Sequence, residues 1–360
     1  MSLKIKVPSS KWAVYGLEFT GVLTPYSLLL TFYFLLSTFH SFSQDIHFSQ
    51  FEYSPLNLNP ANTGMFDGDH RITALHRRQW ASVSAPFQTS GISYDRLIGA
   101  PSEKGNHHNI GLFINSDKAG DGNFGTLQAV LSYSYLFNVG KDSVHFFSAG
   151  IQFGFAQRSV NYSSLTFDNQ FNGDSYNANA LSGENPSQTS FTYADINIGL
   201  AYTSHFDNGT WQTGISVQHI NRPNQTFYDG AKVSLPVRWQ ANLSPTFKAG
   251  ESVTLLPAVL YMQQNKFSEF TGGLEAKLNV KKNGPNKFAF GIGIYARLKD
   301  AIIPAVALYY NNLRVGLSYD VNTSSLKRAS NQQGGPEITL QYIIKKIRTK
   351  TNRSTCCPVY

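Results

Sequence analysis

Charged residues are scarce in this chain of 360 residues, and their scarcity excludes several classes of protein. Asp, Glu, Lys and Arg together make up 14% of the sequence, against roughly 25% in ordinary soluble domains. The chain is also 41% hydrophobic and 14% aromatic, which is the reverse of the composition of a disordered chain. These figures favour a β-rich protein whose polar side chains lie somewhere other than on its outer surface.

Long hydrophobic runs are missing except near the N-terminus. The mean hydropathy is −0.24, and with a single apolar stretch the chain does not fit a bundle of membrane helices. That stretch, at residues 27–37, follows three lysines and precedes two small residues, an order typical of a secretory signal peptide. We predict a signal peptide over residues 1–43, cleaved after Ser43. A single membrane anchor over residues 22–42 is the alternative.

Cysteine is nearly absent, since Cys356 and Cys357 are the only two and both lie among the last five residues. The body of the chain therefore has neither a disulfide framework nor a thiolate metal site. Two alternatives stay open for the pair: a bond to a partner in the oxidising periplasm, or idle thiols on a disordered tail.

Positive charge gathers at the two ends of the chain. The net charge is +8, of which residues 1–43 contribute +2 and residues 345–360 contribute +5, leaving +1 for residues 44–344. A nearly neutral body has no basic stripe to follow a phosphate backbone, which argues against nucleic acid as a partner. We expect residues 346–360 to form a basic periplasmic tail.

Apolar and polar residues alternate from about residue 70 onward. Within residues 237–248, for example, Val237 and Trp239 alternate with Arg238 and Gln240. A period of two places each set on one face of a β-strand. Most of these segments reach the ~9–11 residues that a tilted strand needs to cross a hydrocarbon core. The fourteen predicted strands lie near residues 70–80, 87–98, 107–117, 123–138, 143–158, 191–204, 210–220, 233–248, 252–264, 267–281, 287–299, 301–310, 312–321 and 335–345.

The connections between these segments differ in length in a regular way. Turns rich in Gly, Asn and Asp follow most even-numbered strands, whereas residues 159–190, 221–232 and 322–334 form long connections after odd-numbered ones. Short periplasmic turns, long outer loops and aromatic residues near strand ends are typical of bacterial outer-membrane barrels. We therefore predict an all-β transmembrane barrel of about 14 antiparallel strands over residues 70–345. A soluble β-sandwich or propeller would normally carry more Lys and Glu and fewer aromatics.

Charged residues within the strands fall on the polar face, with both signs mixed. Because a charge facing lipid costs roughly 2–4 kcal/mol near the midplane, this face should line the lumen. Such charges either pair across a plugged interior or line a wet channel, and we favour the plug because ~14 strands enclose a lumen that would otherwise stand open. The predicted lumen charges are Asp195, Arg238, Lys248, Glu275, Lys277, Arg297, Lys299, Arg314, Asp320 and Glu337.

The start of the predicted mature chain carries a family resemblance. Residues 44–64 read QDIHFSQFEYSPLNLNPANTG, and RRQW follows at residues 77–80. They resemble the PorP/SprF family, outer-membrane proteins of the type IX secretion system of Bacteroidetes, which carries a P-L-x-x-N-P-A-x-x-G motif followed by an R-Q-W strand. Weaker matches lie at residues 272–275, 314–320 and 334–337. The motif residues here are Pro55, Leu56, Asn59, Pro60, Ala61, Gly64, Arg78, Gln79 and Trp80.

The resemblance implies attachment and export rather than catalysis, and it implies no cofactor. Family members act with the secretion and gliding machinery of the outer membrane. They receive or anchor secreted proteins with a type B C-terminal sorting domain, including adhesins, and some connect to peptidoglycan through periplasmic lipoproteins. On this view the motif residues bind partners.

Residues 44–69 have two possible structural roles. The prolines at positions 55 and 60 break both helices and strand ladders, so this segment is not a simple strand. It is either a periplasmic docking strip for the machinery or a plug that folds into the barrel, and the two readings are compatible.

Two rival functions remain open. A transport barrel, either a general pore or a hydrophobic-substrate channel, would share the same strand pattern. An outer-membrane hydrolase would need a nucleophile and a base, for which Ser216 and His219 are candidates only by proximity. We do not expect His107 and His108 to bind a metal, because neighbours on a strand point to opposite faces.

Overall fold

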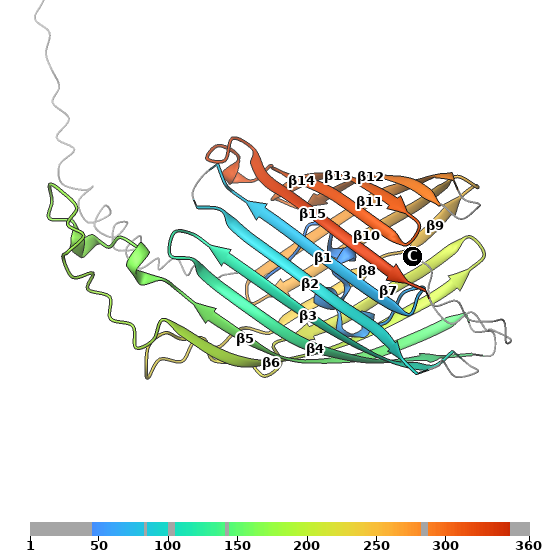
Figure 1. The fold of residues 1–360 in the computed structure, drawn as a ribbon, viewed down its shortest axis with the longest axis horizontal. Helices are drawn as coiled ribbons and strands as arrows, with labels where there is room; N and C mark the ends of the chain where they lie inside the picture. The colour runs from blue at the N-terminus through green and yellow to red at the C-terminus, as the bar shows by residue number, and fades with distance from the viewer. Residues whose placement is uncertain (1–44, 83–84, 100–104, 141–143, 282–286, 346–360) are drawn as a thin grey trace, which may run out of the picture. The chain divides into compact units, whose positions relative to one another are not determined.

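The computed structural model describes residues 45–82, 85–99, 105–140, 144–281 and 287–345, in which antiparallel strands form a closed barrel (Figure 1). The predicted signal peptide, the basic tail and both cysteines lie outside the described residues. No helix among the described residues is long and apolar enough to cross a membrane.

The wall is built from consecutive spans, each hydrogen-bonded to the spans before and after it in the sequence, and β15 returns to pair with β1. The strands are β1 (His70–Gln79), β2 (Phe87–Ile98), β3 (His107–Ala119), β4 (Phe124–Asn138), β5 (His145–Ser159), β6 (Ser190–Phe206), β7 (Gly209–Gln218), β8 (Arg238–Leu243), β9 (Thr246–Ala249), β10 (Val253–Gln264), β11 (Phe267–Lys281), β12 (Phe288–Arg297), β13 (Ala301–Tyr310), β14 (Leu313–Asn322) and β15 (Gln333–Ile344).

The prediction of fourteen spans is confirmed, because β8 and β9 share one span. Both pair with β7 and β10, and the ladder is interrupted at Ser244 and Pro245, where proline has no N–H to donate. The strand predicted over residues 233–248 begins only at Arg238. In the preceding residues the chain makes an isolated bridge from Ser234 to Asn224 instead.

The two ends of the barrel differ in the length of their connections. Residues 160–189, 219–237 and 323–332 lie at one end, which we call the long-loop end. The turns at residues 207–208, 250–252 and 311–312 lie at the other, the short-turn end, where β15 also finishes (Figure 1).

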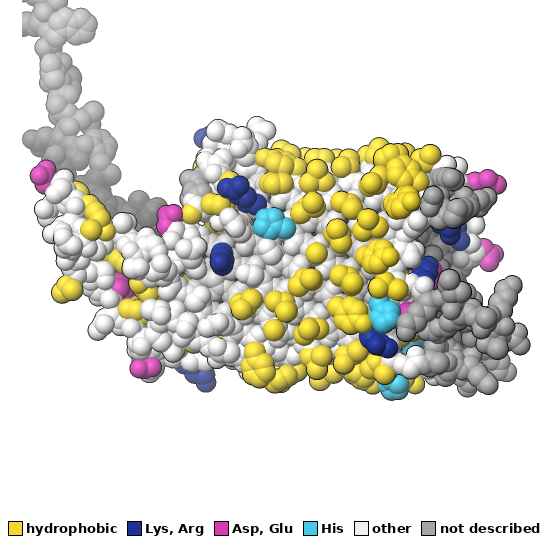
Figure 2. All heavy atoms as spheres, viewed as in Figure 1, with side chains coloured by type: hydrophobic (Ala, Val, Ile, Leu, Met, Phe, Trp, Pro, Cys, Tyr) yellow, Lys and Arg dark blue, Asp and Glu magenta, His cyan; other side chains and the backbone are white. Residues whose placement is uncertain are grey.

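The outer face of the wall is apolar, as the alternation predicts. On β5, Ile151, Phe153 and Phe155 are about half exposed, whereas Gln152 between them is 1% exposed and points inward. Apolar side chains cover the strands in a broad band (Figure 2). A surface of this kind is stable in contact with lipid rather than water.

Several short helices complete the fold. Three lie in the N-terminal segment, where prolines occupy the first helical position of two of them, a place that needs no N–H donor. These are η1 (Phe51–Tyr53), α2 (Pro55–Leu58) and η2 (Pro60–Asn62), while η3 (Tyr162–Ser164), η4 (Asp168–Gln170) and η5 (Ser325–Lys327) lie in the long loops.

Candidate functional site

Residues 45–69, which we call the plug, run through the lumen. At the long-loop end, a carboxylate oxygen of Asp45 lies 2.6 Å from Nε2 of His219, just beyond β7. At the short-turn end, the backbone N–H of Asp69 donates to the carbonyl of Ile344 at 2.8 Å. The segment therefore spans the inside of the barrel rather than lying beneath it (Figure 1).

The motif residues of the plug are buried against the wall. Asn59 is 0% exposed, and its side-chain amide donates to the carbonyls of Leu200 on β6 (3.0 Å) and Ile215 on β7 (3.1 Å). Its oxygen accepts from the N–H of Ala61 at 2.8 Å. One side chain thus ties the plug to two neighbouring strands.

Two glycines of the wall make room for this motif. A Cβ atom at Gly150 on β5 would lie 2.3 Å from the carbonyl carbon of Pro60. A Cβ atom at Gly199 on β6 would lie 2.0 Å from the side-chain oxygen of Asn59. Real Cβ atoms essentially never come this close to other atoms. The missing side chains of these two glycines therefore leave the space that the plug motif fills.

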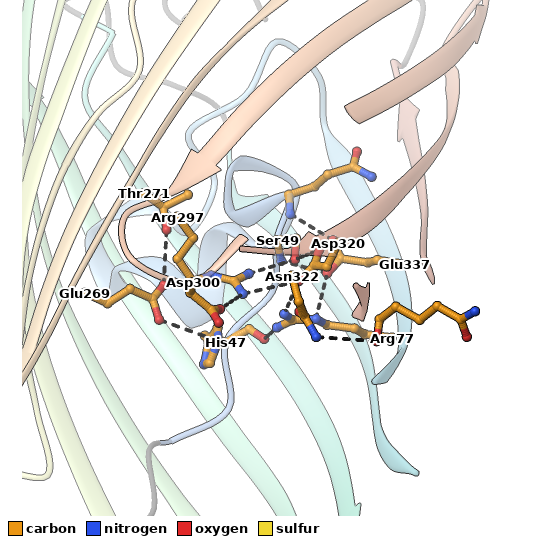
Figure 3. A network of polar contacts seen from close by, with 12 residues as sticks. His47, Ser49, Arg77, Glu269, Thr271, Arg297, Asp300, Asp320, Asn322 and Glu337 are labelled. Carbon is orange, nitrogen blue, oxygen red and sulfur yellow. Dashed lines mark hydrogen bonds and ion pairs between the residues drawn. The ribbon is translucent and has the colours of Figure 1, made fainter. Parts of the chain in front are cut away.

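A buried ionic network fastens the plug near the long-loop end (Figure 3). Asp320 accepts from Arg77 at 2.6 Å and from Arg297 at 3.2 Å, both through Oδ2. Ser49 of the plug donates its hydroxyl to Asp320 at 2.7 Å and its N–H to Glu337 at 2.7 Å. The charges are nearly inaccessible, and burying them is tolerable only because they are paired and hydrogen-bonded.

A second cluster holds the middle of the plug. Arg314 pairs with Glu275 at 3.0 Å, and its guanidinium carbon lies 3.1 Å from the ring centroid of Tyr53 in the plug. The hydroxyl of Tyr53 is 3.2 Å from that of Tyr309, which donates to Glu275. The carboxylate balances the charge of the arginine, and the aromatic ring adds a cation–π attraction.

His219 fixes the start of the plug. Its Nδ1 is 2.7 Å from Asp195 and its Nε2 is 2.6 Å from Asp45. Burial would lower the pKa of His219, but the two carboxylates outweigh burial and raise it to about 9. Ser216 instead donates to the carbonyl of Leu58 at 3.0 Å. The structure gives no hydrogen bond between these two candidate hydrolase residues, and each is engaged with the plug or wall.

The other predicted lumen charges take three positions. Asp195, Arg238, Glu275, Arg297, Arg314, Asp320 and Glu337 are buried in the lumen. Lys277 is half-buried beside Tyr309 and Lys248 lies exposed near the short-turn end. The placement of Lys299 was wrong: β12 ends at Arg297, and Lys299 is an exposed turn residue with a positive φ of 65°.

The R-Q-W part of the motif lies apart from the plug. Arg78 is exposed on the outside of β1, and Gln79 and Trp80 are half-buried at the long-loop end. The Trp80 ring packs edge-on against Phe87 at 4.9 Å. The partner-binding role assigned to the motif residues stays a prediction.

Arg77 is the main functional residue that sequence reasoning missed. It is 1% exposed and reaches Asp320 as well as the carbonyl of His47 at 3.0 Å. The alternation along β1 carries the signal, since Arg71, Thr73 and Arg77 share one face. Arg71 is a further omission: it pairs with Asp95 at 2.7 Å and donates to the plug.

A cavity of about 370 Å³ lies between plug and wall at the short-turn end. Its lining mixes apolar and charged side chains, including Glu52, Phe66, Arg71, Leu256 and Lys277. No cluster of three or more His, Cys, Asp or Glu suited to a metal occurs in the described part of the chain. His107 points into the barrel and His108 points out of it.

Comparisons with known proteins identify a family. The family described as type IX secretion system membrane protein PorP/SprF matches residues 40–342. No curated protein sequence gives a significant match.

Several solved structures have a similar fold. The toluene transporter TbuX of Ralstonia pickettii is 9% identical, with 84% of this chain and 96% of that chain covered and a TM-score of 0.45. The toluene transporter TodX of Pseudomonas putida is 11% identical, with 80% and 92% covered and a TM-score of 0.44. CdiB of Acinetobacter baumannii is 7% identical, with 77% and 60% covered and a TM-score of 0.40.

Proposed function

Because the chain belongs to the PorP/SprF family of type IX secretion system membrane proteins, we propose that it is a non-enzymatic anchor for secreted proteins. It is an outer-membrane β-barrel. The clients are secreted proteins that carry a type B C-terminal sorting domain, including adhesins. This proposal rests on family membership together with the state of the lumen.

The filled lumen is the observation that carries the proposal. The plug is tied to β6 and β7 through Asn59 and to β14 and β15 through Ser49. A barrel whose interior is occupied by its own chain is a rigid platform rather than an open conduit. Such a platform suits attachment, for which loops at one end and machinery at the other need a stable connection.

The long-loop end supplies a surface for the client. The loops of residues 160–189 and 219–237 contact each other, since the Tyr228 hydroxyl donates to Glu184 at 2.7 Å. Phe171 is 56% exposed and Leu181 is 89% exposed on these loops. Large apolar side chains in water favour a protein partner.

In outer-membrane barrels the short turns lie on the periplasmic side, so we place the short-turn end in the periplasm. The cavity of about 370 Å³ opens a mixed polar and apolar surface at this end. We propose that the secretion machinery or a peptidoglycan-linked lipoprotein contacts the barrel here.

The test is client retention in a deletion strain. Export and surface retention of type B clients should both fall, and the intact chain should restore them. A variant with residues 171–183 replaced by a short Gly-Ser linker should insert normally but retain less client. Unchanged export and attachment in the deletion strain would contradict the proposal.

A transport barrel is the second candidate, and the cavity favours it. A hydrophobic-substrate channel would need the plug to move, because the cavity ends against Tyr53 and Leu58 of the plug. Steady conductance or substrate uptake by the purified barrel would support transport over anchoring.

A further inference from the structure

Three histidines on the outer face of the barrel share one local geometry. Each lies in the first two residues of an odd-numbered strand at the short-turn end, points outward, and hydrogen-bonds through Nδ1 to a tyrosine hydroxyl on the next strand. The Nδ1-to-oxygen distances are 2.8, 2.6 and 2.9 Å. The pairs, which we call the His–Tyr belt, are His70 with Tyr94, His108 with Tyr133, and His145 with Tyr202.

The register of the three pairs is the same. The residues directly opposite the histidines are Arg96, Tyr135 and Ser204. In each case the bonded tyrosine lies two positions earlier on the partner strand, so the contact is diagonal. The ring centroids are 6.0, 6.0 and 6.1 Å apart. A geometry repeated on three hairpins is a feature of this wall rather than a chance contact.

The belt lies at the edge of the apolar band. Two residues before each tyrosine, and therefore further from the short-turn end, the same strand carries an outward-pointing aliphatic side chain. These side chains are Ile92, Leu131 and Leu200, which are 54%, 51% and 56% exposed. A tyrosine with its ring against such residues and its hydroxyl toward the turns is typical of a membrane interface. The opposite wall lacks the feature, because no histidine occurs after residue 219.

Each imidazole keeps one nitrogen for a ligand. Nδ1 is engaged by the tyrosine, and within the described part of the chain Nε2 of these three histidines has no hydrogen-bond partner. When the tyrosine donates to Nδ1, the neutral ring carries its proton on Nε2, and a protonated ring carries protons on both nitrogens. Both forms present an N–H donor at the level of the lipid head groups. Arg96, opposite His70, adds a permanent positive charge.

We propose that the His–Tyr belt binds the phosphate groups of phospholipids in the leaflet at the short-turn end. Nε2–H donates to a phosphate oxygen, the tyrosine holds the ring in the required orientation, and the acyl chains lie along the aliphatic residues beneath. The belt thereby gives β1–β6 a lipid contact that β10–β14 do not have. The inference rests on the outer-membrane location and is independent of client binding.

Native mass spectrometry of the full barrel in detergent tests this. The probes are phosphatidylglycerol and monogalactosyldiacylglycerol with identical acyl chains, the second having no phosphate. The wild type should bind the first three phosphatidylglycerol molecules about tenfold to a hundredfold more tightly than the galactolipid, since one hydrogen bond to a charged group is worth about that factor. The triple variant His70→Phe, His108→Phe, His145→Phe should lose this preference.

His76 provides a matched control. It also points outward from β1, but it lies toward the long-loop end and bonds Ser90 at 2.9 Å, so His76→Phe should keep the preference. If the triple variant fails to fold, the variant Tyr94→Phe, Tyr133→Phe, Tyr202→Phe retains all rings and should still weaken the preference. Equal binding by wild type and triple variant, equal loss in His76→Phe, or binding of inorganic phosphate as tight as the lipid would overturn the proposal.

Discussion

The two ends of the lumen hold the plug by different means. Near the long-loop end, Arg77 and Arg297 converge on Asp320, and His219 lies between two carboxylates. Near the short-turn end, the plug borders a cavity of about 370 Å³. There the plug contacts one buried ion pair, in which Asp95 accepts from the N–H of Gly64 at 2.7 Å and Arg71 donates to the carbonyl of Asn62 at 3.1 Å.

The difference indicates which end leaves the plug room to move. Buried ion pairs are costly to break because a charge left without its partner stays buried, so the network resists movement of the plug at the end where we place the client. The cavity leaves room at the other end, where we place the machinery.

The largest expected effect comes from breaking the network. Arg77→Leu removes the cation beside Glu337 and one of the two arginines that pair with Asp320, and it should cost about 3–5 kcal/mol. The temperature at which the compact band on unboiled gels converts to the unfolded form should fall accordingly. Arg78→Leu, one residue away but exposed on the outer face, should change stability by less than about 0.5 kcal/mol. Similar behaviour of both variants would disprove the role of this network in holding the plug.

A shape change at the wall should move the plug with a smaller loss of stability. Gly150→Ala places a Cβ against Pro60 and should cost about 1–3 kcal/mol. Gly272→Ala on β11 is the control, because its Cβ would meet nothing closer than 3.6 Å. Maleimide labelling of Ala61→Cys, in a background without Cys356 and Cys357, should increase with the first change and not with the second.

The His219 contacts predict a dependence on pH. Its folded pKa of about 9 exceeds the unfolded value near 6.5, so the stabilisation is complete below pH 6.5 and is lost as pH rises through 9. We expect up to about 3 kcal/mol of stability to disappear over that range. Thermal conversion of the gel band between pH 6 and pH 10 measures it, and His219→Asn should flatten the profile. A wild-type profile as flat as that of the variant would exclude this role.

Substitutions in the exposed loops should have the smallest effect on stability. Leu181→Ser should leave the barrel within about 0.5 kcal/mol of wild type, yet reduce client retention at the cell surface. Val139→Ser, which changes an exposed apolar residue at the short-turn end, should leave retention unchanged. Equal retention by both variants would shift the client site away from residues 160–189.

Sequence patterns predicted the wall well because strand alternation is local. The outward set on β5 and the inward charges on β11, β12 and β14 follow from a period of two. Alternation does not detect breaks that depend on single residues. One is the interruption at Pro245, and another is the end of β7 before His219, whose φ is +59°.

The site was harder to predict because its contacts are distant in the sequence. Asp45 and His219 are 174 residues apart, and Ser49 meets Asp320 across 271 residues. No periodicity encodes such pairs. The motif around Asn59 indicated that the segment matters, but its position inside the lumen follows only from closure of the barrel around it.

Conductance of the purified barrel in a planar bilayer tests the central claim most directly, namely that the plug fills the lumen and makes the barrel an anchor. The account predicts that the wild type is silent and that Arg77→Leu produces channel openings under the same conditions. Steady, large ion flow through the wild-type barrel would contradict it.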